Sequence, residues 1–304
     1  MGQVRRAAHM DVSNTVDVTD PAAVSAAVCH ILTGCYPGYA FSQVESLVAD
    51  FSRLYRGSYP GFSACDIGYH DMQHVLDVTL AMARLLDGHD RSETGALHLG
   101  PELALAGIAT ALFHDSGYIR RTRDSRNKNG AAYTRIHVSR SARFLEEYLP
   151  QAGMAHLSGI CTRIVHFTGY EIDPQHIEVG NDRERRLGEL LGTADLIAQM
   201  ADVDYVLKCR EYLYEEFRAG GLAGEHAAQY PGVTVFRSPQ DLLESTPDFM
   251  RNAIVVSRDA QFGAVYRYAA AHFGGSDLYM DAIKANACRL EAELAVNGAH
   301  VAIQ

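Results

Sequence analysis

The segment PELALAGIATALFHDSGY, residues 101–118, joins a long apolar run to a polar end. Pro101 followed by Glu102 is typical of a helix start, where proline loses no hydrogen bond. The residues up to Phe113 are almost wholly apolar, which predicts a helix buried on all sides. His114 and Asp115 follow directly, in a place where a carboxylate is costly unless it is paired or binds a metal ion. This segment therefore predicts both a core helix and a functional site at its end.

Helical periodicity recurs on both sides of this segment. Apolar residues three and four apart, in stretches between the nine prolines, predict further helices. The predicted ranges are 41–55, 70–86, 101–113, 136–149, 153–167, 184–200, 203–217, 248–273 and 277–296. Strand-like alternation is confined to Val233–Phe236. We therefore predict an all-α fold, a compact bundle of eight to ten helices with a metal site between them.

Length and composition predict an ordinary globular protein. The chain has 304 residues, 47% of them apolar and 21% charged, which excludes a disordered chain, a collagen and a coiled-coil rod. Its 27 basic and 37 acidic residues give a net charge of −10. An acidic surface disfavours binding to nucleic-acid polymers and to anionic membranes. The six cysteines form no Cys-x-x-Cys pair, so we expect a reducing, cytoplasmic location and no membrane segment.

We expect one principal domain, over residues 36–296. Residues 1–35 are expected to form a partly loose N-terminal tail, and residues 297–304 a C-terminal tail. The glycine-rich stretch within 219–247 is expected to be a loop or a small insertion.

Several histidines and aspartates stand out against apolar surroundings. His70 and His74 are four residues apart, which places both on one face of the predicted helix. His137 begins the helix after His114-Asp115, and His166 lies near the end of the next one. Asp195 is a lone acid in an apolar helix, where it binds a metal or pairs with an arginine from another helix. Mixed nitrogen and oxygen ligands suit Fe, Mn, Zn or Mg.

The order His, His-Asp, Asp on helices resembles the HD-domain superfamily of metal-dependent phosphohydrolases. The stretch Tyr69–Val78, YHDMQHVLDV, is similar to the Tyr-His-Asn-x-x-His-x-x-Asp-Val motif of cyclic-nucleotide phosphodiesterases. The resemblance covers roughly residues 40–290. It implies an HD-domain bundle in which His74, His114, Asp115 and Asp195 bind a first metal ion. It also implies that His70 is the general acid, although Asp71 replaces the asparagine of the motif.

Binuclear HD proteins, including the HD-GYP cyclic-di-GMP phosphodiesterases, are similar in having two more histidines before the final aspartate. The resemblance therefore implies that His137 and His166 bind a second ion and that Asp115 bridges the two. The alternative is that both histidines lie on helix surfaces. Tyr118 stands where the HD-GYP family usually has lysine.

A basic loop follows His114-Asp115 and contains Arg120, Arg121, Arg123, Arg126 and Lys128. Arg120 and Arg121 are predicted to bind substrate phosphate, and the alternative is a solvated surface loop. The phosphodiesterases recognise a purine through a Gln-x-x-Phe motif, which the C-terminal helices here lack: Gln261-Phe262 has the wrong spacing.

Three functions are consistent with these patterns. The first is a phosphodiesterase that hydrolyses a nucleotide or cyclic nucleotide, so that its partner is a small phosphorylated substrate. One or two divalent metal ions would activate water, and Asp115 and His70 would be the catalytic residues. The second is a di-iron oxygenase of HD type, and the third a non-catalytic metal or nucleotide sensor. A homo-oligomer is compatible with all three.

Overall fold

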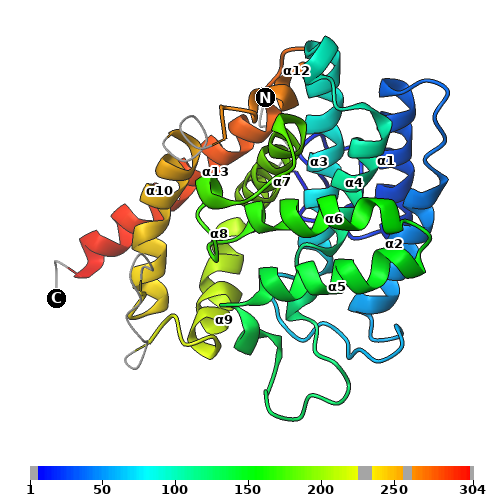
Figure 1. Ribbon diagram of the computed structural model, residues 1–304. Helices are drawn as coiled ribbons and strands as arrows, with labels where there is room; N and C mark the ends of the chain where they lie inside the picture. The colour runs from blue at the N-terminus through cyan, green and yellow to red at the C-terminus, as the bar shows by residue number, and fades with distance from the viewer. Residues whose placement is uncertain (1–5, 225–234, 256–261, 302–304) are drawn as a thin grey trace.

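The structure, a computed structural model, describes residues 6–224, 235–255 and 262–301. Over these residues the chain is all-α, as predicted: it is built from helices, and its β pairing consists of isolated bridges such as Met10–Asp17. The helices pack as a bundle with a long C-terminal helix along one side (Figure 1).

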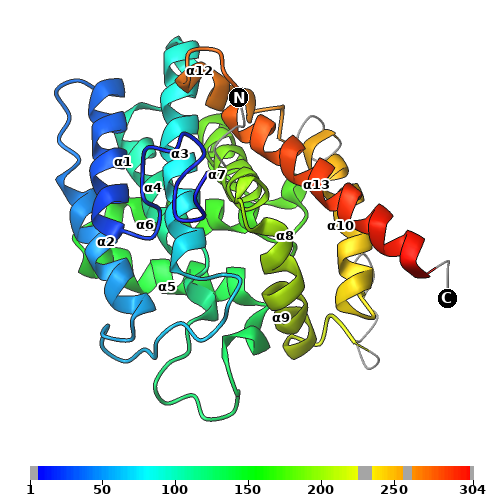
Figure 2. The ribbon, with the colours of Figure 1, turned by 180° about the vertical axis from the view of Figure 1, so that it is seen from behind.

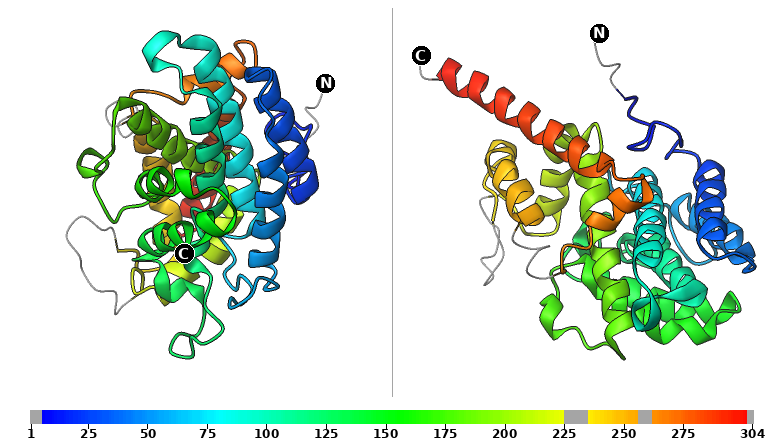
Figure 3. Two further views of the ribbon diagram at one scale, coloured as in Figure 1. Left: turned by 45° about the vertical axis from the view of Figure 1, so that its right-hand side comes forward. Right: turned by 90° about the horizontal axis from the view of Figure 1, so that it is seen from above.

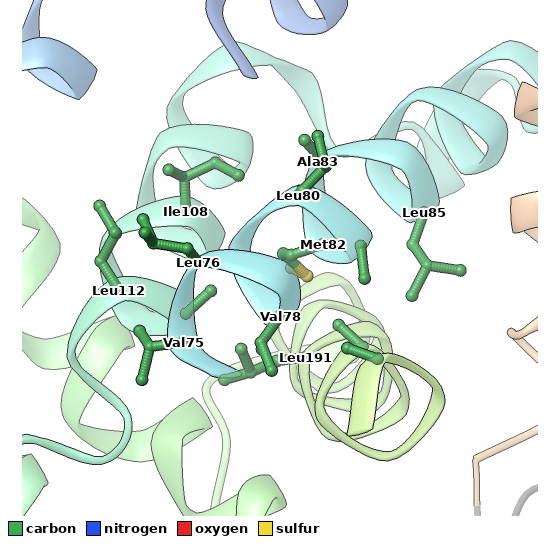
Figure 4. Packing of buried hydrophobic residues seen from close by; sticks show 14 of the residues in the cluster. Val75, Leu76, Val78, Leu80, Met82, Ala83, Leu85, Ile108, Leu112 and Leu191 are labelled. Carbon is green, nitrogen blue, oxygen red and sulfur yellow. The ribbon is translucent and has the colours of Figure 1, made fainter. Parts of the chain in front are cut away.

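Helix α3 (Met72–Ser92) is the centre of the bundle, and nearly all of its side chains from His74 to Asp90 are buried. Four helices pack against it (Figure 2). They are α1 (Pro21–Cys35), α4 (Gly100–Phe113), α7 (Asp182–Ala201) and α12 (Arg267–His272). Apolar side chains of α3, such as Leu76 and Val78, form one core with Ile108 of α4 and Leu191 of α7 (Figure 4).

The remaining helices surround this centre. Helix α2 (Ser42–Tyr55) packs on α1 and α4, and α5 (His137–Gln151) packs on α6 (Ala155–Ile164). Helices α8 (Tyr205–Lys208) and α9 (Tyr214–Ala219) flank a π-helical segment, Cys209–Leu213. Helix α10 (Pro239–Val255) packs against α13 (Leu278–Val301), the long C-terminal helix that also lies along α7 (Figure 3).

Short 3₁₀ turns connect several of these helices. They are Gly95–Leu97, Ser116–Tyr118, Gly130–Tyr133, Val165–Thr168 and Pro174–His176.

Three predicted helices differ from the observed ones. The helix predicted from residue 70 begins at Met72, because the Asp71 side chain accepts the His74 N–H and caps it. The helix predicted over 203–217 is interrupted by the π-helical segment. The helix predicted over 248–273 is α10 and α12, with a turn at Gly263 and Ala264, whose φ angles are positive. Residues 256–261 lie outside the described residues.

The segment before residue 36 is more ordered than the predicted tail. Val24, Val28 and Leu32, four residues apart, form the buried face of α1, and burial of that face holds the helix on α3. Asp11 is also buried, and its carboxylate accepts a hydrogen bond from Arg84 of α3 at 2.5 Å. Residues 1–5 lie outside the described part of the chain.

The two other segments predicted to be irregular are also partly helical. Helix α10 already begins at Pro239, and α13 continues to Val301. Residues 225–234 and 302–304 lie outside the described residues, so the predicted strand Val233–Phe236 is described only at its end, where Phe236 forms a bridge with Ala223.

The stretch Gly95–Tyr118 is long and apolar enough to cross a membrane by length and composition alone. Most of it is buried inside the protein, because α4 packs between α2, α3, α6 and α7. The burial of α4 in the core therefore accounts for its composition.

Asp90 joins three helices near one end of the bundle. Its carboxylate accepts hydrogen bonds from the Tyr36 hydroxyl and His89 Nδ1, both at 2.7 Å, and from the N–H groups of Leu99 and Gly100. Burial alone would raise the pKa of Asp90, but these bonds outweigh it and lower the pKa to about 2.

We expect Asp90→Asn to reduce the free energy of unfolding by about 2 kcal/mol near neutral pH, since it removes the negative charge that accepts these four hydrogen bonds. The folded pKa of Asp90 is below the ordinary value of 3.8, so this stability is present above about pH 4 and is lost as the pH falls toward about 2. Urea unfolding of both proteins should therefore show a difference that shrinks below about pH 4. A difference that stays constant through that range contradicts the prediction.

Candidate metal centre

The end of α4 places two polar side chains in the core. His114 follows Phe113, the last residue of the helix, and Asp115 begins the turn after it. Helix α4 is buried on all sides, so His114 and Asp115 at its end are buried as well, at 1% and 2% exposure. This is the arrangement that the sequence predicted for residues 101–118.

Two other helices bring His74 and Asp195 to the same point. His74 lies in the first turn of α3, and Asp195 lies in the second half of α7. Asp115 Oδ2 is 3.2 Å from His114 Nε2 and 3.4 Å from His74 Nε2. Asp195 Oδ1 is 3.4 Å from His74 Nε2 and 3.8 Å from His114 Nε2. The structure thus brings the four predicted first-metal ligands together.

Within the described part of the chain, three of these atoms are buried without a hydrogen-bond partner: His74 Nε2, His114 Nε2 and Asp115 Oδ2. They lie within 4.8 Å of one another. Ligand atoms at about 2.1 Å from a cation are about 3.0 to 3.4 Å apart in octahedral or tetrahedral geometry, close to the separations here. Since unpartnered buried polar atoms are costly, the arrangement fits a bound cation.

Hydrogen bonds to backbone carbonyls orient two of the histidines. His114 Nδ1 lies 2.8 Å from the Ala111 carbonyl, and His137 Nδ1 lies 2.7 Å from the Thr134 carbonyl. In each case the Nδ1–H donates, so the lone pair of a neutral imidazole is on Nε2. A histidine binds a metal ion through such a lone pair, and in both residues the nitrogen that carries it faces Asp115.

Strong electrostatic coupling accompanies this geometry. Burial alone would lower the pKa of His74, but the nearby carboxylates of Asp115 and Asp195 raise it to about 10. Burial would likewise raise the pKa of Asp115, but His114 and His70 hold it well below its ordinary value. The cluster therefore favours an anionic carboxylate next to positive charge, which protons or a cation can supply.

His137 approaches the other side of Asp115. Its Nε2 is 3.8 Å from Asp115 Oδ1, whereas Oδ2 faces His74 and His114. Burial lowers the pKa of His137, which favours the neutral imidazole. Asp115 thus presents one oxygen to each side, the arrangement that a bridging carboxylate requires.

His166 lies in the 3₁₀ turn Val165–Thr168, and its buried Nδ1 has no hydrogen-bond partner among the described residues. Glu171, five residues later, accepts hydrogen bonds from the Val138 and Ser139 N–H groups at the start of α5. Glu171 thereby ties the segment after His166 to the helix that begins with His137. The role of His166 as a metal ligand stays a prediction.

His70 lies before α3 rather than on it, yet its ring centroid is 5.7 Å from that of His74. Glu216 of α9 holds it: Glu216 Oε2 is 2.6 Å from His70 Nδ1, and Oε1 accepts the Tyr69 N–H. Burial would lower the pKa of His70, but the charges of Glu216 and Asp115 raise it. Sequence reasoning missed Glu216, which is 146 residues from His70 in a pair of glutamates typical of an exposed helix.

The basic loop has other partners in the described structure. Arg120 Nε and Nη2 donate to Asp66, and Arg121 pairs with Glu147 and lies over the Phe62 ring. Both guanidinium groups are therefore already paired with carboxylates. Their predicted role in phosphate binding would require these pairs to open.

No protein-family model matches the sequence, and no curated protein matches it either. Among solved structures, the fold is similar to the crystal structure of the phosphodiesterase domain of the RhoPDE fusion protein from the choanoflagellate Salpingoeca rosetta. The TM-score is 0.55 over 94% of each chain, at 14% sequence identity. At this identity the likeness shows a shared fold, and the HD-domain assignment stays a prediction.

Proposed function

We propose that this protein is a metal-dependent phosphohydrolase of phosphodiesterase type, acting on a nucleotide or cyclic nucleotide. The observation that carries the proposal is that three buried atoms, one each from His74, His114 and Asp115, lie close together without a hydrogen-bond partner among the residues that the structure describes. The shared fold with a phosphodiesterase domain supports the same class of reaction.

The first metal ion would be held by these three residues and Asp195. A bound divalent cation supplies Lewis acidity, which lowers the pKa of water and neutralises phosphoryl charge. His137 and His166 would hold a second ion, with Asp115 shared between the two. Such local positive charge lets a protein with a net charge of −10 bind an anionic substrate.

His70 is the proton donor in this proposal. Glu216 binds its Nδ1, so its Nε2 is the nitrogen left to face the substrate. Hydrolysis expels an oxygen that must gain a proton, and a histidine held by a carboxylate is suited to donate it. Glu216 acts through His70 and is a positioning residue.

The proposal is tested by elemental analysis of the purified protein, together with assays on bis(p-nitrophenyl) phosphate and a panel of nucleotides and cyclic nucleotides. We expect bound metal and metal-dependent hydrolysis. His70→Ala should lower kcat by about 100-fold and leave the metal content unchanged, because His70 donates a proton without binding metal. His156→Ala is the matched control, since His156 is an exposed histidine that pairs with Glu102.

Metal-loaded protein that hydrolyses none of these compounds contradicts the proposal, as does full activity in His70→Ala. The assay also separates the alternatives. Activity with Mn²⁺ or Mg²⁺ under argon excludes the oxygenase, whereas oxygen consumption by the iron-loaded protein without hydrolysis favours it. Tight nucleotide binding without turnover favours the sensor.

A further inference from the structure

The ring of Tyr118 contacts two histidines that come from different elements. Its centroid is 4.6 Å from that of His70, at an interplanar angle of 20°, and 4.4 Å from that of His137, at 18°. Tyr118 is only 2% exposed. Both imidazoles are therefore stacked on a buried aromatic ring.

The two imidazoles also lie close to each other. The centroids of His70 and His137 are only 6.2 Å apart, and their planes are inclined by 36°. One tyrosine ring therefore contacts two neighbouring imidazoles.

Several contacts fix the position of Tyr118. The residue belongs to the 3₁₀ turn directly after Asp115, and its hydroxyl is hydrogen-bonded to the Thr134 side chain. The Thr134 carbonyl in turn accepts the Nδ1–H of His137. The backbone of Gly130 lies so close that a Cβ there would be 2.4 Å from the Tyr118 carbonyl oxygen. The ring therefore has little freedom to shift under the imidazoles.

We propose that Tyr118 is a positioning residue whose ring stacks with both His70 and His137 and holds them in place. The proposal rests on the proposed function for the roles of these two histidines, as proton donor and second-metal ligand. The Tyr118 ring sets the spacing of these two imidazoles. The aromatic ring carries this role, and the hydroxyl does not.

The first test is NMR of the imidazole ring protons of the metal-free protein, assigned with His70→Gln and His137→Gln. Protons above an aromatic face move upfield because of its ring current. We expect upfield shifts for both histidines in the wild type and in Tyr118→Phe, and their loss in Tyr118→Leu. Ordinary shifts in the folded wild type overturn the proposal, and this result does not depend on Tyr118→Leu folding.

The second test compares metal content and kinetics. Tyr118→Phe should stay within about threefold of the wild-type kcat, whereas Tyr118→Leu should lose about 100-fold in kcat, with a smaller change in KM and a lower metal content, because small misplacements of reacting groups are costly. Equal losses in the two variants would assign the role to the hydroxyl and overturn the proposal.

Tyr39→Leu is the control for removal of a tyrosine ring, since the Tyr39 hydroxyl bonds Glu102 in the first turn of α4, at the opposite end from His114. Absence of hydrolysis in all proteins, with ring-current shifts lost only in Tyr118→Leu, would reject the proposed function and keep the positioning role.

Discussion

Asp115→Asn is expected to lose metal binding and phosphoester hydrolysis together, with kcat/KM reduced by more than about 100-fold, the loss seen even for residues that only support metal ligands. Asparagine keeps the size of the side chain but removes the anion that faces three histidines. Asp115 Oδ2 lies between His74 and His114, and Oδ1 faces His137. In the variant, an amide NH₂ donates to an imidazole nitrogen that would otherwise bind the cation.

Metal analysis and thermal unfolding check this prediction without any substrate. A cation that binds only the folded state raises its melting temperature. Added Mn²⁺ should therefore raise the melting temperature of the wild type and leave that of Asp115→Asn unchanged. Asp281→Asn, an exposed aspartate in the first turn of α13, is the matched control and should behave as the wild type. A variant that binds metal as the wild type does would remove Asp115 from the ligand set.

Gly117→Ala is expected to destabilise the fold by about 3 kcal/mol, the upper end of the cost of overpacking, and to disrupt the metal centre. A Cβ at Gly117 would lie 1.8 Å from the His137 carbonyl oxygen and 2.9 Å from the Ser141 nitrogen. Both atoms belong to the backbone of α5, so a side-chain rotation cannot relieve the clash. The turn or the whole helix must move.

That movement would break contacts on both sides of the glycine. Its N–H donates to Ser141 Oγ at 2.8 Å, and its carbonyl accepts from Arg140 Nε at 2.6 Å. It would also separate His137 from Asp115, since the glycine lies between them. We therefore expect lower metal content even in the fraction that folds.

Urea unfolding and metal analysis measure the two effects of Gly117→Ala. Gly34→Ala is the control, because a Cβ at this helical glycine meets only a distant arginine nitrogen, at 3.9 Å. It should be neutral or slightly stabilising. Wild-type stability and metal content in Gly117→Ala would show that the close approach of α5 is not required.

Much of the fold could be predicted because local patterns encode it. The apolar run to Phe113 predicts a core helix from its composition, and α4 is that helix. The three- and four-residue spacing in 41–55 likewise predicts α2 with its buried face. The π-helical break and the turn at Gly263 and Ala264 were not predicted, since their departures from regular helix leave no periodic signal.

Part of the candidate site could likewise be predicted from the sequence, and part of it could not. The order of residues in the sequence identified His74, His114, Asp115 and Asp195 as a set, and the fold places their side chains together. Glu216 and the stacking of Tyr118 with two histidines could not be found in this way, because their partners are remote in sequence or belong to other elements. For the basic loop, the sequence showed only that it is rich in arginine. Its ion pairs with Asp66 and Glu147 depend on where the fold places those carboxylates.

The sequence by itself determined the helical class, the burial of α4 and the polar residues at its end, because apolar periodicity and the cost of buried charge act within a short stretch of chain. The tertiary structure alone decided which side chains meet. It brings Glu216 to His70, presents His137 to the second oxygen of Asp115, and stacks Tyr118 with both His70 and His137. These contacts depend on how separate helices pack, and in particular on how closely α5 approaches Gly117, which no local pattern specifies.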